Sequence, residues 1–406
     1  MRKAIIILGA LIFGLIAGIL IADKAAPVVE AASLIGTLWL NALRMTIIPL
    51  VVSLLIVGVV KAAAMARAGR MTTRAIVTMM VLLWCSAILG AFLTPALLTA
   101  FPLPIDAAEA LRGALATAAP AGDVPPFTEF LRAIIPTNPV AAAANDAILP
   151  LIIFTLAFAF AITRLPEKKR DTMADFFGAI ADAMLILVKW VLVLAPVGVF
   201  ALSLVVGAKA GVEAFGALVH YVVIVTSVGT VVWIFSFPFA AIGGRKSPLT
   251  FFRAAAPAQA VAISTQSSLA SLPAMVTGVK AMGVGERSAD VVLPISVALF
   301  RATGPCMNLA VVIYVAHLMG IELTFTALAI GVVAAAITTL GAVSLPGAVS
   351  FITSIAPIAI AMGVPVEPLV LLLAIEAFPD IMRTLANVTM DMAVTTTVAR
   401  AEGDIS

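Results

Sequence analysis

The chain has 406 residues, of which 63% are hydrophobic and only 11% are charged. A soluble domain of this length does not need so much apolar surface, so the composition predicts an all-α polytopic membrane protein. Long apolar runs exclude a membrane β-barrel, whose strands alternate apolar and polar residues. The net charge of +3 gives no sign of a nucleic-acid-binding surface. Cys85 and Cys306 lie in separate apolar runs, so we expect no metal site and no cofactor.

The first half of the chain divides into apolar segments long enough to cross a membrane. Residues 1–3 precede an apolar run at 4–22, which we interpret as a first helix and not as a removed signal. Further spans are expected near residues 34–60, 72–100, 143–164, 176–206 and 215–241. Basic clusters follow the second, fourth and sixth spans, which places these clusters and the N-terminus in the cytoplasm. The acidic, proline-containing connection at about 101–135 suits a long external loop.

The second half contains segments that are too polar or too interrupted for simple spans. Residues 251–282 include the serine-rich run Ser264–Ser268, which indicates two half-length helices that meet at a polar tip. Such a re-entrant hairpin is tolerated at membrane depth where it lines a cavity or is buried in protein. A second candidate hairpin covers residues 326–362, and the span between the two, at about 290–319, is broken by Arg301–Pro305. Paired interrupted segments are typical of a transporter with inverted repeats, although kinked helices in a receptor or scaffold remain the alternative.

A stripe of polar and charged residues marks the final helix. It consists of residues spaced at i, i+4, i+7, i+11 and i+15, namely Glu376, Asp380, Arg383, Asn387 and Asp391. This spacing puts them on one face of a helix. Charges inside a lipid-embedded segment are costly, so the stripe is expected to face a cavity, a partner or a bound solute. The alternative is a set of internal salt bridges that hold the helices together.

The chemistry of this stripe favours an acidic amino acid as the solute. The planar guanidinium of Arg383 suits a carboxylate, and Asp380 either neutralises it or receives an ammonium group. Serine hydroxyls and half-helix N-termini in the hairpins add donors for anions. No pairing of a nucleophile with a base is evident, so we do not expect an enzyme.

Short motifs occur along nearly the whole chain in a recognisable order. They are Ile48-Pro49-Leu50-Val51, Ile135-Pro136-Thr137-Asn138-Pro139, Ala195-Pro196-Val197-Gly198-Val199-Phe200, Ser267-Ser268 with Leu272-Pro273, Leu345-Pro346-Gly347-Ala348, and Arg383-Thr384-Leu385-Ala386-Asn387-Val388-Thr389. The last is highly specific. In these motifs the chain resembles the glutamate transporter family, the dicarboxylate/amino acid:cation symporters.

The resemblance implies eight transmembrane helices and two re-entrant hairpins in a homotrimer of the inner (plasma) membrane, with both termini cytoplasmic. The lipid bilayer and a small acidic amino acid are then its partners, and nucleic acid is not. Residues 1–70 and 101–210 would form a scaffold domain. Residues 71–100 and 211–406 would form a transport domain that moves like an elevator, with the second hairpin as its gate.

The resemblance also assigns roles to residues. Arg383 would bind the substrate side-chain carboxylate and Asp380 its amino group, while Asn387, Thr384 and Ser268 would hold the α-carboxylate and amino group. The other residues of the expected substrate site lie at the hairpin tips: Gln266, Ser267, Leu345, Pro346, Gly347 and Val349. Members for neutral amino acids usually lack the arginine, and members for plain dicarboxylates usually lack the aspartate. The presence of both favours aspartate or glutamate.

The sodium sites of the family are not maintained. Sodium-coupled members usually carry Asn-Met-Asp-Gly-Thr in span 7, where this chain has either Phe300-Arg301-Ala302 or Arg301-Ala302-Thr303 in place of Asn-Met-Asp. Gly304 or Pro305 replaces a threonine near the substrate. Val81-Leu82-Leu83, in place of polar residues in span 3, supplies no oxygen ligand from its side chains.

Asp391, the family's other sodium carboxylate, remains, and we expect Arg301 to reach it as a fixed cation. A fixed cation is not released in each cycle, which predicts sodium-independent transport. The alternative is that Arg301 snorkels to the surface. Glu376 is a candidate for proton coupling, with a helix-packing hydrogen bond as an equal alternative. Other readings are a C4-dicarboxylate or cystine transporter, a sodium-coupled symporter, and an anion channel or substrate sensor.

Overall fold

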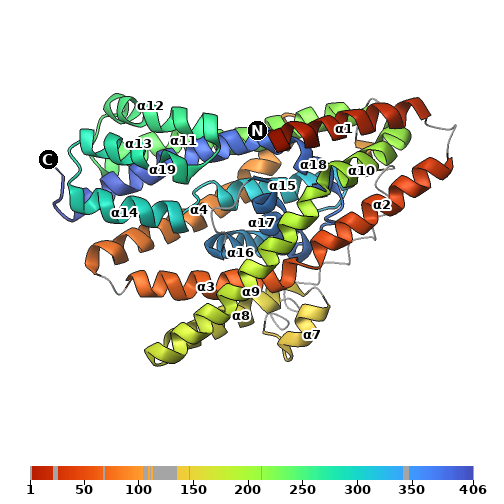
Figure 1. Ribbon diagram of the computed structural model, residues 1–406. Helices are drawn as coiled ribbons and strands as arrows, with labels where there is room; N and C mark the ends of the chain where they lie inside the picture. Colours follow the sequence, from red (N-terminus) through yellow and green to blue (C-terminus); the bar gives the residue numbers. More distant parts are fainter. Residues whose placement is uncertain are drawn as a thin grey trace.

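The computed structural model describes residues 2–21, 26–66, 69–103, 108–109, 111–112, 135–145, 147–211, 213–341 and 347–405. Within these ranges the chain is almost entirely α-helical and contains no β-strand (Figure 1). The helices are α1 (Arg2–Ile21), α2 (Ala26–Arg44), α3 (Ile47–Ala66), α4 (Arg70–Ala100), α7 (Pro139–Ala144), α8 (Ile148–Thr163), α9 (Glu167–Val193), α10 (Ala195–Ala210), α11 (Glu213–Gly243), α12 (Pro248–Thr265), α13 (Ser268–Ala281), α14 (Glu286–Leu299), α15 (Gly304–Met319), α16 (Phe325–Gly341), α17 (Gly347–Ala361), α18 (Pro368–Ile375) and α19 (Ala377–Ala401).

Several of these helices have the length and composition of membrane spans. Among the described residues, five helical stretches are long and apolar enough to cross a bilayer: Ala26–Met65, Arg70–Ala100, Glu167–Val193, Ala214–Gly243 and Glu286–Met319. Five shorter helices are apolar as well. This confirms the all-helical membrane class that the composition predicts.

Prolines break three segments that the sequence analysis treats as continuous. The expected span at 34–60 falls on two helices, α2 and α3, and the span at 176–206 falls on α9 and α10. The final helix is divided at Glu376 between α18 and α19. In each case a proline (Pro49, Pro196 or Pro379) lies within the first three residues of the new helix. Its ring clashes with the carbonyl four residues earlier and it has no N–H to donate, so the ladder of hydrogen bonds is interrupted there.

The segments expected to form hairpins do fold as pairs of packed helices. Helices α12 and α13 pack against each other and are joined by Gln266 and Ser267. Gln266 has a left-handed backbone (φ 52°) that reverses the chain, and the Ser267 hydroxyl caps α13 by accepting from the N–H of Ala270 at 3.2 Å. Helices α16 and α17 also pack together. The expected break near Arg301 is present as well, between α14 and α15.

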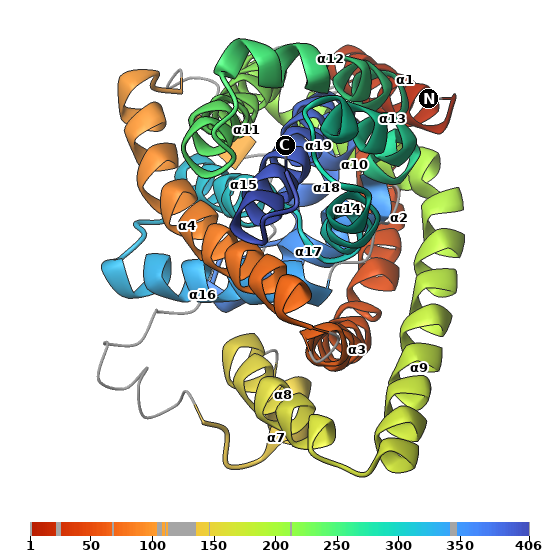
Figure 2. The same ribbon diagram turned by 90° about the vertical axis from the view of Figure 1, so that its left-hand side faces the viewer.

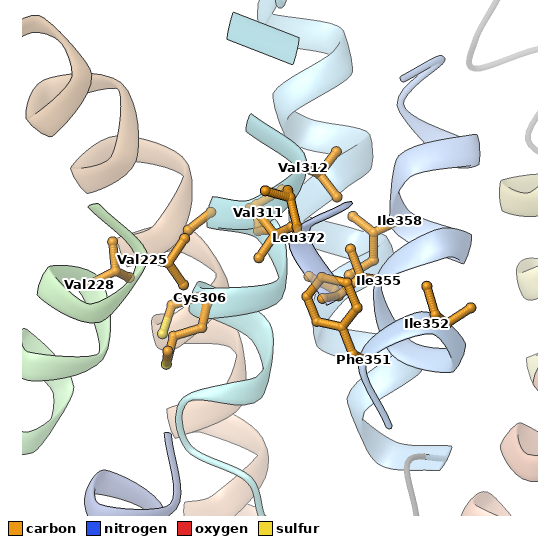
Figure 3. Close-up of a cluster of buried hydrophobic side chains, with 14 of the residues drawn as sticks. Val225, Val228, Cys306, Val311, Val312, Phe351, Ile352, Ile355, Ile358 and Leu372 are labelled. Carbon is orange, nitrogen blue, oxygen red and sulfur yellow. The ribbon is translucent and has the colours of Figure 1, made fainter. Parts of the chain in front are cut away.

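Helix α19 lies at the centre of the second half of the chain. It packs against α11, α12, α13, α14 and α4, which surround it in Figure 2. Figure 3 shows a neighbouring core in which apolar side chains of α11, α15 and α17 meet, among them Val225, Cys306 and Ile355. Because α15 and the second half of α19 are buried on nearly all sides, a polar side chain on them must find its partners inside the protein.

Glycines bring α1 and α10 into close contact. A Cβ at Gly18 would lie 2.2 Å from the carbonyl oxygen of Leu204, and one at Gly207 would lie 2.2 Å from that of Leu15. Small residues that allow backbones to approach are characteristic of helix packing in membranes. These two helices lie side by side along one edge of the molecule (Figure 1).

The C-terminal segment caps the first turn of α14, and this cap carries a testable pH dependence. The N–H of Ser288 donates to Asp404 Oδ2 at 2.9 Å, which lowers the pKa of Asp404.

Replacing Asp404 by alanine should destabilise the protein by about 1 kcal/mol at neutral pH. Because the folded-state pKa is the lower one, this contribution is complete above the unfolded pKa and is lost as the pH falls through the folded value. Thermal unfolding of both proteins in detergent across this range measures it. If the difference in unfolding temperature between the two proteins did not decrease at acidic pH, Asp404 would not be the cap of α14.

Candidate functional site

A small internal cavity lies where α15, α16, α17 and α19 meet. Its volume is about 20 Å³, which is room for about one water molecule. The residues that line it are Arg301, Gly304, Asn308, Thr339, Phe351, Ser354, Glu376, Asp380, Arg383 and Asn387. Four residues of the predicted stripe therefore share one cavity with the arginine from the break between α14 and α15.

The guanidinium of Arg383 contacts three polar side chains inside the protein. Its Nη2 donates to Glu376 Oε1 at 2.8 Å and its Nη1 donates to Asn308 Oδ1 at 2.7 Å. Its Nε lies 3.5 Å from Asp380 Oδ1. The Arg383 side chain is only 13% exposed, so this pairing is what makes a buried guanidinium tolerable.

Glu376 is more deeply buried than Asp380, the other carboxylate that lines the cavity. It is 3% exposed, and its second oxygen, Oε2, accepts a hydrogen bond from the hydroxyl of Tyr221 at 2.9 Å. Glu376 lies at the break between α18 and α19, which Pro379 causes three residues later. Glu376 thus lies at the boundary between α18 and α19, with one carboxylate oxygen bound to Tyr221 of α11 and the other to Arg383.

Asn387 fixes the broken segment between α14 and α15 to α19. Its Oδ1 accepts from both the backbone N–H and the hydroxyl of Thr303, each at 2.9 Å. The Thr303 hydroxyl also lies 3.3 Å from the carbonyl oxygen of Arg383. Thr303, predicted as a residue of the altered ion site, therefore positions Asn387. Thr384 is buried on the same helix but does not line the cavity.

Asp391 is the last residue of the stripe, and the charge of Arg301 acts on it from the break between α14 and α15. Arg301 lines the cavity, and its charge interacts with those of Arg383, Asp380 and Asp391. Asp391 is completely buried, and neither of its oxygens has a hydrogen-bond partner among the described residues. The guanidinium of Arg301 is the cation that acts on this carboxylate.

The predicted hairpin residues lie outside the cavity lining, as far as the structure describes them. Gln266 Nε2 donates to the carbonyl oxygen of Ala377 at 3.1 Å, so the tip of the first pair already contacts the start of α19. Ser267 caps α13, and Ser268 is its partly exposed first residue. In the second pair, Leu345 and Pro346 lie outside the described residues. Gly347 and Val349 belong to α17, where only their backbone is described.

Four polar residues of this region are not among the residues that the sequence predicts for the site. They are Asn308, Thr339 and Ser354, which line the cavity, and Tyr221, which binds Glu376. Asn308 carries the clearest signal, because it is the only side-chain amide in the apolar helix α15 and a buried amide requires a partner. Tyr221 is one of only two tyrosines in the chain.

Comparison with known proteins assigns the chain to a family of transporters. The proton/glutamate-aspartate symporter of Escherichia coli is 26% identical over 382 residues, which cover 92% of this chain and 86% of that protein. C4-dicarboxylate transport protein 1 of Pseudomonas aeruginosa strain UCBPP-PA14 is 26% identical over 410 residues (97% and 87%). The proton/sodium-glutamate symport protein of Bacillus subtilis is 27% identical over 375 residues (91% and 86%). A family model described as the sodium:dicarboxylate symporter family matches residues 4–401. The resemblance is confirmed: the chain belongs to the sodium:dicarboxylate symporter family and is a multi-pass membrane transport protein.

Proposed function

We propose that the chain is a secondary transporter of an acidic amino acid, aspartate or glutamate, which works without sodium and is coupled to protons. The observation that carries this proposal is the pairing of Arg383 with Asp380 in one buried cavity. The guanidinium suits the substrate side-chain carboxylate, and the aspartate suits its amino group. Two of the relatives are named as glutamate symporters: the name of the one from Escherichia coli includes protons, and the name of the one from Bacillus subtilis includes protons and sodium. These names support the acidic amino acid and the proton, and sodium independence rests on the residues of this chain.

The remaining contacts would come from α19 and the two hairpins. Asn387 and Thr384 are on the helix that carries Arg383, and Ser268 is at the tip of the first hairpin. The expected site also includes the other hairpin residues, namely Gln266, Ser267, Leu345, Pro346, Gly347 and Val349. A cavity of about 20 Å³ is too small for an amino acid. Substrate entry therefore requires a movement, for which the second hairpin is the proposed gate.

An elevator mechanism requires one part of the chain to move against another. We assign residues 71–100 and 211–406 to the moving domain, and residues 1–70 and 101–210 to the scaffold of a homotrimer. In support, α19 packs against α4 and α11–α14, all from the first group, while α1 and α2 of the second group each pack on α10. The eight spans, the re-entrant position of both hairpins and the cytoplasmic termini belong to the same proposal.

Sodium independence is supported by the surroundings of Asp391. Arg301 already acts on this carboxylate as a permanent positive charge, as described above. In span 3, Val81, Leu82 and Leu83 have no oxygen in their side chains. A mobile hard cation needs several oxygen ligands and a carboxylate that is free to receive it.

The decisive test is radiolabelled aspartate exchange in proteoliposomes, with sodium replaced by choline on both sides at constant pH. We expect exchange to continue undiminished, because no sodium ion is needed to complete the site. Loss of exchange in choline would show that Asp391 and backbone carbonyls still bind sodium. Absence of exchange in both salts would overturn the choice of substrate.

A second candidate substrate is a C4-dicarboxylate. The relative from Pseudomonas aeruginosa, as similar to this chain as the one from Escherichia coli, is named as a C4-dicarboxylate transport protein. Asp380 argues against it, since this carboxylate has a favourable partner in an amino group and none in a plain dicarboxylate. Competition by succinate against labelled aspartate separates the two. Saturable counterflow separates any carrier from an anion channel or sensor.

A further inference from the structure

Arg383, the proposed binding residue for the substrate side chain, is already engaged by a carboxylate of the chain itself. Its Nη2 lies 2.8 Å from Glu376 Oε1, and the pair is buried, with side-chain exposures of 13% and 4%. The cavity beside it has room for about one water molecule. A substrate carboxylate that takes a pair of parallel hydrogen bonds from Arg383 therefore competes with Glu376 for Nη2.

We propose that Glu376 is the coupling carboxylate of this transporter: the substrate carboxylate displaces it from Arg383, and Glu376 takes up one proton from water as it leaves. This inference rests on the proposed function of Arg383. The ion pair between Arg383 and Glu376 breaks, a new one forms between Arg383 and the substrate, and the proton binds Glu376 Oε1. Oε2 continues to accept from the hydroxyl of Tyr221.

Burial is the physical reason for proton uptake. Glu376 is 3% exposed, so without Arg383 it would be a buried anion with a single neutral donor, Tyr221. An unpaired buried carboxylate costs several kcal/mol, and protonation removes that charge. Since one carboxylate replaces another on Arg383 and the displaced one becomes neutral, the net charge around the guanidinium is unchanged.

Few titratable or charged groups act on Glu376. The titratable groups that act on Glu376 are Arg383 and Asp380 on α19 and Tyr221 on α11. Helices α1, α10 and α17 also pack against α18. Helix α17 has no charged residue, the described side chains of α1 are all apolar or glycine, and α10 has Lys209 in its last turn. Asp380 faces two arginines, Arg383 and Arg301, and so retains a cation when the substrate binds. Glu376 does not retain a cation when the substrate binds Arg383, so Glu376 is the group that takes up the proton.

The experiment counts protons during binding. Purified full-length protein in sodium-free choline buffer is titrated calorimetrically with aspartate and, separately, with succinate, in buffers of different ionisation enthalpy at one pH. We expect uptake of about one proton per ligand in the wild type and none in Glu376→Gln. The wild-type dissociation constant should rise about tenfold per pH unit in the alkaline part of the profile, and that of Glu376→Gln should stay constant. The control Glu322→Gln, at an exposed position between α15 and α16, should behave as the wild type.

The outcomes separate this inference from the proposed function. If aspartate bound without proton uptake, the proposed displacement and protonation of Glu376 would be wrong, and the substrate assignment would not be affected. Equal uptake by Glu376→Gln would overturn the role of Glu376. Binding of succinate alone with one proton would support the exchange and overturn aspartate as substrate, and binding of neither ligand would overturn both. The number of protons that the wild type takes up per bound ligand can be measured whether or not a variant folds.

Discussion

Replacing Arg383 by lysine is expected to weaken aspartate binding by at least about 30-fold, or about 2 kcal/mol, while leaving the protein folded. Lysine keeps the positive charge between Glu376 and Asp380, so neither carboxylate is left without a cation. It does not keep the planar arrangement of donors by which Arg383 reaches Glu376 and Asn308 through two different nitrogens. A substrate carboxylate that needs two parallel hydrogen bonds therefore loses one of them.

The measurement is aspartate affinity by titration calorimetry, accompanied by thermal unfolding to show that the fold is intact. A matched control is Arg170→Lys, which makes the same change in an ion pair with Asp171 at the surface. We expect no effect of this control on affinity, because surface pairs contribute little and the site is not involved. If Arg383→Lys bound aspartate within about threefold of the wild type, Arg383 would not be the residue that holds the substrate carboxylate.

The candidate site shows what a single sequence does and does not predict. The spacing of Asp380, Arg383 and Asn387 on one helix is a local property, so periodicity alone places them on a common face. The partners that complete the site come from distant segments. Tyr221 is 155 positions from Glu376, and Asn308 is 75 positions from Arg383. Such contacts depend on how helices pack, which hydrophobic periodicity does not specify.

Helix boundaries were missed for a different reason. The prolines were visible in the sequence, but a proline is compatible with the first turn of a helix as well as with a kink. At Pro379 the choice matters, because Glu376, which binds Arg383 and Tyr221, lies at the boundary between α18 and α19. The spacing predicts a stripe that faces a cavity, a partner or a bound solute, with a set of internal salt bridges as the alternative. The structure combines the two, since the same Arg383 forms the ion pair and lines the cavity.

Replacing Arg301 by alanine is expected to make the protein dependent on sodium for its stability. Asp391 would lose the cation that acts on it and become a buried carboxylate with no compensating charge. Removing the opposite charge that acts on a buried carboxylate is expected to destabilise the folded protein. The shorter side chain also leaves more room in the cavity that Arg301 lines, into which a small cation can enter. Thermal unfolding in sodium chloride and in choline chloride measures the effect. The wild type should unfold at the same temperature in both salts, and Arg301→Ala should be destabilised in choline and partly restored by sodium.

The double variant Arg301→Ala with Asp391→Asn tests whether the two charges are coupled. It removes the arginine and the carboxylate together, so we expect it to be more stable in choline than Arg301→Ala alone and to show no response to sodium. This non-additivity is the signature of Arg301 acting as a built-in replacement for a mobile cation. If Arg301→Ala were as stable as the wild type in choline, or if the double variant still responded to sodium, then Asp391 would not be neutralised by Arg301. The proposed sodium independence would then need a different physical cause.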